Sequence, residues 1–99
     1  MAVFTTREGL DTEQALRIHS KGQYKPFSRD TLLLSVYDSL RHRKTALEDA
    51  TALTNTILGR LYTQVEQATL ERDTVVEVTA AVLSRFDAAA ATHYRAFHP

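Results

Sequence analysis

The stretch Lys25-Pro26-Phe27-Ser28-Arg29-Asp30 lies where the spacing of apolar residues along the sequence changes. Before it, apolar and polar residues alternate as they do in strands, and after it apolar residues recur every three or four positions, as they do in helices. Ser28 is suited to accept from the first free N–H groups of a helix, and Asp30 falls in the first turn, where the helix dipole favours an acid. We therefore predict that a strand region ends and a helical region begins within this stretch.

Three strands are predicted before the helical region. Residues 2–6 are β-branched and aromatic, residues 15–19 alternate apolar with polar, and residues 24–27 continue in extended form. Residues 20–23 lie between the last two of these segments, and Gly22 is free to adopt a positive φ. We expect a β-hairpin with its turn centred near Lys21 and Gly22.

Four apolar stripes at helical spacing follow the hairpin. The first begins after Ser28, runs through Leu40 and is expected to end in the basic segment 41–44; the second covers 47–65. The third covers 75–86 and is β-branched, so that a strand is the alternative there. The fourth covers 87–97 and is rich in alanine, the best helix former.

These elements predict a mainly helical α+β fold, in which a four-helix bundle is capped by a small antiparallel sheet of about three strands. The chain has 99 residues, of which 43% are hydrophobic and 24% charged, and this length suits a single domain. We expect residues 1–27 to form the β-cap of this domain and residues 28–99 its helical bundle.

Several classes of site are excluded by the composition. The chain has no cysteine, which excludes disulfides, thiolate zinc sites and a cysteine nucleophile. No glycine-rich phosphate loop occurs, and the four histidines are dispersed without the spacing of a metal site. We expect neither an enzyme nor a metal centre.

The charge pattern limits the classes of partner. The formal net charge is zero, so no overall field draws the chain to nucleic acid or to an anionic membrane. Residues 1–47 hold eight basic and five acidic residues, whereas residues 48–99 hold four basic and seven acidic residues. No apolar run is long enough to span a bilayer, and the N-terminus is too short and polar for a secretion signal. We expect a cytoplasmic protein that does not contact membranes.

Short motifs carry a resemblance to a known family. They are Val3-Phe4-Thr5-Thr6, the hairpin that ends in Gly22, and Pro26-Phe27-Ser28-Arg29-Asp30 before a helix. Together they resemble the ATP-cone, a nucleotide-sensing domain, in the version found in bacterial transcriptional repressors of ribonucleotide reductase operons. The apolar spacing from Leu70 to Asp87 and the aromatic end 94–97 extend this likeness over nearly all of the chain.

The resemblance implies a function as well as a fold. ATP or dATP, with or without magnesium, would bind between cap and helices and change the oligomeric state, as part of the control of ribonucleotide reductase or of its transcription. The implied partners are a second copy of the chain or a regulatory protein. In the repressors a cysteine-rich zinc ribbon contacts DNA, so direct DNA binding is not expected of this cysteine-free chain. The candidate nucleotide-binding residues are Arg17, His19, Ser20, Lys21, Lys25, Ser28, Thr31 and Arg72.

The chain departs from the family pattern at the phosphate site. His19 and Ser20 stand where the family has a Lys-Arg pair, and Thr31 stands where it has a lysine. One hypothesis is that Lys21, Lys25, Arg17 and Arg72 supply the missing positive charge from neighbouring positions. The alternative is a degenerate cone that no longer binds nucleotide and serves as a protein-interaction or oligomerisation module. The two hypotheses differ in whether Lys21 and Lys25 face the same side as Arg72.

Two further motifs have two interpretations each. The basic segment 41–44 suits a phosphate or RNA contact, but it also suits the C-terminal end of a helix, where cations complement the dipole. Tyr94 and Phe97 suit stacking on a base or an oligomer contact, but their spacing also suits packing within the bundle.

Overall fold

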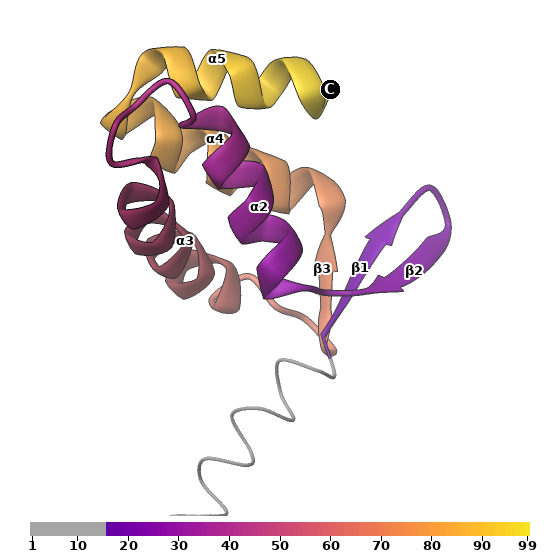
Figure 1. The fold of residues 1–99 in the computed structure, drawn as a ribbon. Helices are drawn as coiled ribbons and strands as arrows, with labels where there is room; N and C mark the ends of the chain where they lie inside the picture. Colours follow the sequence, from indigo (N-terminus) through magenta and orange to yellow (C-terminus); the bar gives the residue numbers. More distant parts are fainter. Residues whose placement is uncertain (1–15) are drawn as a thin grey trace, which may run out of the picture.

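The computed structural model describes residues 16–99, which form three strands and four helices (Figure 1). The predicted strand 2–6 lies outside these described residues. The mainly helical α+β fold is confirmed. The elements in chain order are β1 (Arg17–Ser20), β2 (Gln23–Pro26), α2 (Arg29–Ser39), α3 (Ala46–Tyr62), β3 (Thr69–Glu71), α4 (Arg72–Phe86) and α5 (Ala88–Phe97).

Helix α2 begins as the sequence predicts and ends earlier. The hydroxyl of Ser28 accepts from the N–H of Thr31 at 3.1 Å, which makes Ser28 the N-cap. The N–H of Leu40 then donates to the carbonyl of Tyr37, and Leu40 is fully buried at the turn that follows. The prediction that the helix ends within 41–44 is wrong, because these residues already form the connection to α3.

The other three helices lie where the apolar stripes place them. Helix α3 (Ala46–Tyr62) begins one residue and ends three residues before the corresponding limits of the predicted range 47–65, and α4 begins at Arg72 rather than at Val75. The β-branched segment of α4 is a helix, so tertiary packing of its apolar face outweighs the strand propensity of its valines. Helix α5 begins at an N-cap formed by Asp87, whose carboxylate accepts from two N–H groups of the first turn.

The sheet has the strand order β2-β1-β3 and is mixed, so the prediction of an antiparallel sheet is wrong. Strands β1 and β2 form the predicted antiparallel hairpin, in which Lys21 and Gly22 both have positive φ, of 53° and 77°. Strand β1 pairs with β3 in parallel, with Ile18 opposite Leu70. Parallel pairing requires a long crossover connection, and α2 and α3 supply it between β1 and β3.

Strand β3 was not predicted from the sequence. It has only three residues, and only Leu70 among them is apolar, with 1% of its surface exposed. Gln67 and Ala68 adopt positive φ directly before it, so the chain turns sharply into the sheet. The sheet therefore combines residues from 1–27 with residues from 28–99, and the expected division into cap and bundle does not describe it.

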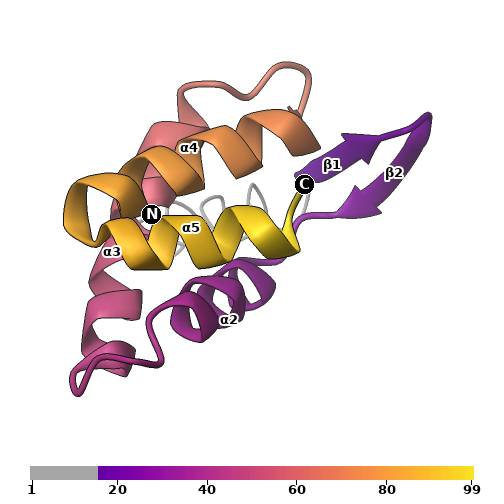
Figure 2. The same cartoon turned by 90° about the horizontal axis from the view of Figure 1, so that it is seen from above.

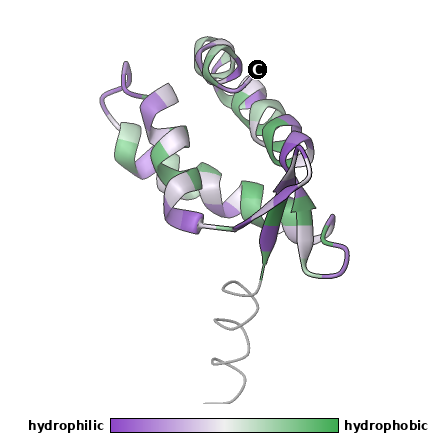
Figure 3. Ribbon diagram, turned by 90° about the vertical axis from the view of Figure 1, so that its right-hand side faces the viewer, coloured by the Kyte–Doolittle hydropathy of each residue, from purple (hydrophilic) through white to green (hydrophobic). Residues whose placement is uncertain are grey.

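The core lies where the four helices and the sheet meet. Val36, Ile57, Leu83 and Tyr94, one from each helix, belong to a single cluster of buried apolar residues. Figure 3 shows the hydrophobic residues interleaved with hydrophilic ones along the helices, as expected for amphipathic helices that bury one face. Seen from above, α5 lies between α2 and α4, and the hairpin projects from one end of the helices (Figure 2).

Candidate ligand site between the hairpin and the helices

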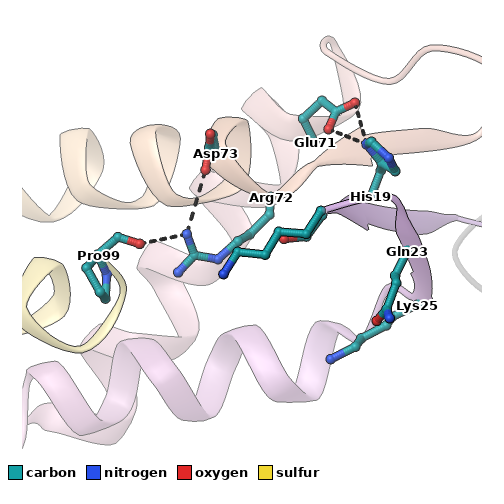
Figure 4. Close-up of a pocket in the computed structure, with 9 residues that line it drawn as sticks. His19, Gln23, Lys25, Glu71, Arg72, Asp73 and Pro99 are labelled. Carbon is teal, nitrogen blue, oxygen red and sulfur yellow. Dashed lines mark hydrogen bonds and ion pairs between the residues drawn. The ribbon is translucent and has the colours of Figure 1, made fainter.

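A polar hollow lies where the hairpin meets the beginning of α4 (Figure 4). Its volume is about 600 Å³, and its walls come from β1, β2, the turn between them, the start of α4 and the C-terminal end of the chain. The residues that line this polar hollow are His19, Ser20, Lys21, Gln23, Lys25, Glu71, Arg72, Asp73 and Pro99.

An apolar hollow of about 320 Å³ shares two wall residues, Lys25 and Arg72, with the polar hollow. Helices α2, α4 and α5 supply most of its walls. Apolar side chains such as Ile18, Phe27 and Val75 line it, together with the ring of Tyr94. Ser28, Thr31 and Ser35, which carry hydroxyl groups, also line it.

Seven of the eight candidate residues line one or both hollows. Arg17 is the exception, since it lines neither, and its guanidinium lies 5.1 Å from the centre of the Tyr24 ring. Arg17 shares its face of β1 with His19, and both contact the ring of Tyr24, but Arg17 lies at the start of the strand, away from the hairpin turn beside which the polar hollow lies. The seven residues that line the hollows are His19, Ser20, Lys21, Lys25, Ser28, Thr31 and Arg72.

The imidazole of His19 is bound to a carboxylate that the sequence analysis did not consider. Its Nδ1 lies 2.8 and 3.0 Å from the two carboxylate oxygens of Glu71, which is the cross-strand neighbour of His19 in β3. The ring also packs against that of Tyr24 at a tilt of 39°, with 4.8 Å between the ring centres. Because β3 was not recognised in the sequence, Glu71 carried no signal that would place it in the site.

Arg72 stands between the two hollows and is held by the C-terminal end of the chain. Its Nη1 donates to the main-chain oxygen of Pro99 at 2.9 Å, and the same nitrogen lies 3.6 Å from a carboxylate oxygen of Asp73 (Figure 4). The side chain is 35% exposed, so its charge is partly accessible from the hollows.

Lys21 and Lys25 line the same hollow as Arg72, which is the arrangement that the hypothesis of a relocated phosphate site requires. Neither lysine forms an ion pair with a residue in the range 16–99. Two carboxylates, Glu71 and Asp73, also line this hollow, and that of Glu71 is already bound by His19. The ammonium groups of the two lysines are therefore the charges most accessible to an anion.

Two rings near the end of α5 close one side of the apolar hollow. His98 stacks on Tyr94 with 4.1 Å between ring centres, and Nδ1 of His98 bonds to the carbonyl of Tyr94 at 2.8 Å. Tyr94 is 2% exposed, and its burial raises the pKa of its hydroxyl. The predicted packing of Tyr94 in the bundle is confirmed, whereas Phe97 is 70% exposed.

The described residues form no all-protein metal site. Within 16–99, no group of three or more histidine or carboxylate side chains is placed to hold a metal ion. Magnesium that accompanies a nucleotide is bound mainly through phosphate oxygens and one or two carboxylates. Asp73, with its side chain 93% exposed in the polar hollow, is the carboxylate that is free of histidine contacts there.

The basic segment 41–44 takes part in a second polar cluster, far from the hollows. Nε2 of His42 and Nη1 of Arg43 bond to the same carboxylate oxygen of Asp87, at 2.9 and 3.1 Å. Arg43 also donates to Asp49 at 3.0 Å and covers the ring of Phe86 at 4.5 Å. These bonds join the α2–α3 connection to the start of α5, so two of the four basic residues have a structural role.

Hydrogen bonds lower the pKa of both carboxylates in this cluster. The bonds from His42, from the N–H of Ala90 and from Arg43 lower the pKa of Asp87 from 3.8 to about 2. The hydroxyl of Thr45 and the guanidinium of Arg43 lower the pKa of Asp49. Both groups are therefore ionised at neutral pH.

Comparison with known proteins found no relative of this chain: no protein-family model, no curated protein and no solved structure matches it. The likeness to the ATP-cone rests on the sequence motifs alone.

None of the helices within residues 16–99 combines the length and the apolar character that crossing a bilayer requires.

Proposed function

We propose that this chain binds a nucleotide, ATP or dATP, in the two hollows and acts as a regulatory module of the ATP-cone type. One observation carries the proposal, namely that a cation-lined polar hollow and an apolar hollow share Lys25 and Arg72 as wall residues. A nucleotide has the matching division, since its phosphates are anionic and its base is a flat ring with apolar faces.

Each hollow suits one part of the ligand. Lys21, Lys25 and Arg72 supply permanent positive charges for the phosphates, and these charges replace the Lys-Arg pair that the family has at positions 19 and 20. Phe27 and Tyr94 offer apolar and aromatic surface to the base. Ser28 and Thr31 place hydroxyl groups beside it.

The proposed role is regulatory and cytoplasmic rather than catalytic. Among the described wall residues, no serine is hydrogen-bonded to a histidine, and His19 is engaged by Glu71. A regulatory module needs only that one conformation or oligomeric state binds the ligand more tightly than another. The ribonucleotide reductase system, as the enzyme or as its operon, is the proposed target.

Calorimetric titration of the full chain with ATP, dATP and AMP, in the presence of magnesium, tests the proposal. We expect micromolar binding of a triphosphate. A ligand at about 100-fold over Kd adds about 2.7 kcal/mol to the free energy of unfolding, which for this size raises Tm by about 10–20 °C. Absence of heat and of a Tm shift at millimolar ATP would contradict the proposal.

Substitution of the two lysines tests the site. We expect Lys21→Gln with Lys25→Gln to weaken triphosphate binding about tenfold or more, because two charge-assisted contacts are lost. Lys44→Gln is the matched control, since Lys44 is an exposed lysine in the α2–α3 connection and lines neither hollow. Equal weakening by the control would indicate non-specific attraction only.

A degenerate cone that serves in protein interaction or self-association is the second candidate. It is favoured by three large apolar side chains that are exposed on the helices, Leu34 at 65%, Leu47 at 64% and Phe97 at 70%. Sedimentation of the chain with and without ATP separates the two candidates. A stable dimer whose size does not respond to nucleotide would favour the second.

A further inference from the structure

The two ring nitrogens of His19 have different surroundings. Nδ1 lies 2.8 and 3.0 Å from the two carboxylate oxygens of Glu71, the neighbour of His19 in β3. Nε2 has no hydrogen-bond partner among residues 16–99, although the ring lines the polar hollow. Contact with the ring of Tyr24, at 4.8 Å between ring centres, also holds the imidazole in place. Nε2 is therefore the nitrogen that His19 can offer to a ligand.

The carboxylate of Glu71 decides which nitrogen of the neutral ring carries the proton. An ionised carboxylate has no hydrogen to donate, so Nδ1 must supply the N–H of this hydrogen bond. Nε2 of the neutral ring then holds only a lone pair, which accepts hydrogen bonds and repels an anionic oxygen. His19 can therefore donate from Nε2 to a phosphate only after the ring has gained a second proton and become an imidazolium.

The charges around His19 decide when this proton is gained. The charged side chains that line the hollow with it are Lys21, Lys25, Glu71, Arg72 and Asp73. Arg17, on the same strand, lies 5.1 Å from the centre of the Tyr24 ring. The basic groups disfavour a positive ring and the carboxylates favour it, and the phosphates of a bound nucleotide add further negative charge. Histidine ordinarily changes its charge between pH 5 and 8, so the effect of the phosphates is measurable near neutral pH.

We propose that His19 binds the phosphates of the ligand as an imidazolium, so that nucleotide binding takes up a proton and is favoured at lower pH. This inference rests on the proposed function, because it concerns the regulation of the same site. The proton comes from the solvent and stays on Nε2, which donates it in a hydrogen bond to a phosphate oxygen. Occupancy of the site thereby depends on pH as well as on the concentration of nucleotide.

Calorimetric titration of the full chain with ATP and magnesium at pH 7.5 measures the proton uptake. In buffers of different ionisation enthalpy, the slope of the observed heat gives the number of protons, and we expect an uptake of about half a proton. The affinity should then rise about threefold for each unit by which the pH falls near this value. A phosphate group of the ligand also titrates, near pH 6, but cations around it make it lose a proton, which is a change of the opposite sign.

Three variants assign the proton to His19. His19→Gln offers an N–H donor that does not titrate, so we expect the uptake to fall nearly to zero and the affinity to lose this dependence on pH. Glu71→Gln no longer fixes the tautomer, so a neutral ring can donate from Nε2, and the uptake should fall there too. His42→Gln is the matched control, because a glutamine can still donate to Asp87 in the distant cluster, and it should keep the uptake of the natural chain.

Nitrogen NMR of the isotope-labelled full chain tests the protonation of the ring directly. Long-range nitrogen–proton spectra distinguish the two neutral tautomers from the imidazolium. We expect the neutral ring of His19 to carry its proton on Nδ1 in the ligand-free chain at pH 8. Saturation with ATP and magnesium at pH 7.5 should then move the ring nitrogens toward the imidazolium positions. Loss of one histidine signal in His19→Gln assigns the resonances.

The outcomes separate this inference from the proposed function. If ATP binds without proton uptake, or with an uptake that His19→Gln retains, this inference is refuted and the nucleotide site stands. A ligand-free neutral ring with its proton on Nε2 also refutes it, because His19 could then donate without a further proton. Absence of ATP binding at every pH between 6 and 8 overturns both proposals.

Discussion

The side chains of His42 and Asp87, 45 positions apart in the chain, meet at 2.9 Å between Nε2 and Oδ2. Asp87 is at the same time the N-cap of α5, where its other oxygen accepts from the N–H groups of Ala89 and Ala90 at 3.0 and 3.2 Å. One carboxylate therefore fixes both the start of the last helix and the connection between the first two described helices.

Replacement of this carboxylate should weaken the whole fold. We expect Asp87→Ala to lower Tm clearly, because it removes the cap of α5 and the acceptor shared by His42 and Arg43. Thermal denaturation followed by circular dichroism measures the effect. Asp38→Ala is the control, since Asp38 is exposed and, among residues 16–99, pairs with Arg41 alone at 3.4 Å. Equal changes in the two variants would show that the shared acceptor has no special role.

The stability of the protein should depend on pH through the same group. The pKa of Asp87 is lowered to about 2 in the folded state, against about 3.9 in an unfolded chain. The contribution of the ionised Asp87 carboxylate to the free energy of unfolding is therefore complete above the unfolded-state pKa. It disappears as the pH falls through the folded-state pKa. Urea denaturation from pH 2 to pH 7 should show Asp87→Asn to be less stable than the natural chain near neutrality, with the difference closing toward pH 2. A constant difference over this range would contradict the assignment.

A buried hydroxyl offers a stabilising substitution. Thr54 in α3 is fully buried, and its Oγ1 has no hydrogen-bond partner among the described residues. We expect Thr54→Val to raise the free energy of unfolding by about 1 kcal/mol, because an unsatisfied polar atom is replaced by a methyl group of similar size. Urea denaturation measures it. Thr56→Val, on the exposed side of the same helix, should change stability by less than about 0.5 kcal/mol.

The hairpin turn depends on Gly22. Its φ of 77° is unfavourable for a residue with a Cβ, although nothing lies within 4 Å of the place where a Cβ would stand. We expect Gly22→Ala to cost about 1 kcal/mol of stability, and Gly22→Asn to cost less, because asparagine tolerates the left-handed region. Equal losses in denaturation experiments would show that side-chain size, rather than backbone conformation, decides this position.

Removal of the Glu71 carboxylate should strengthen the proposed phosphate site. Glu71→Gln makes the polar hollow more positive and frees His19, so we expect triphosphate to bind about threefold more tightly. Calorimetric titration measures the change. The control is Glu77→Gln, because Glu77 is an exposed acid of α4 that lies 3.6 Å from Arg95 and outside both hollows. Unchanged or weaker binding to Glu71→Gln would argue against phosphates in this hollow.

The sequence predicts the helices of this fold better than its sheet. Long apolar stripes located α3, α4 and α5 to within a few residues, because burial of one helix face leaves a repeated pattern. Strand β3 leaves no pattern, since it has three residues and only Leu70 is apolar. The direction of its pairing depends on the path of α2 and α3, which no local pattern records.

Only part of the candidate site could be predicted, because local sequence signals locate some of its residues and tertiary structure alone brings in the others. The hairpin turn and the motif before α2 are local signals, and they located Lys21, Lys25 and Ser28 beside the hollows. Glu71 and Pro99 reach the site only through tertiary structure. Arg17 was misplaced because the strand pattern does not show how far along β1 the hollow extends: Arg17 shares a face with His19 but lies at the start of the strand, away from the hairpin turn.

The parallel pairing of β1 with β3 has a consequence for the order of folding. The hairpin of β1 and β2 closes over two residues, but His19 and Glu71 are separated by 52 positions. Closing so long a loop carries a large entropic cost, and the pairing gains its stabilisation only after α2 and α3 have packed. We therefore expect the polar hollow, which needs residues from both ends of this loop, to be among the last parts of the molecule to form, so that a ligand bound there would report that folding is complete.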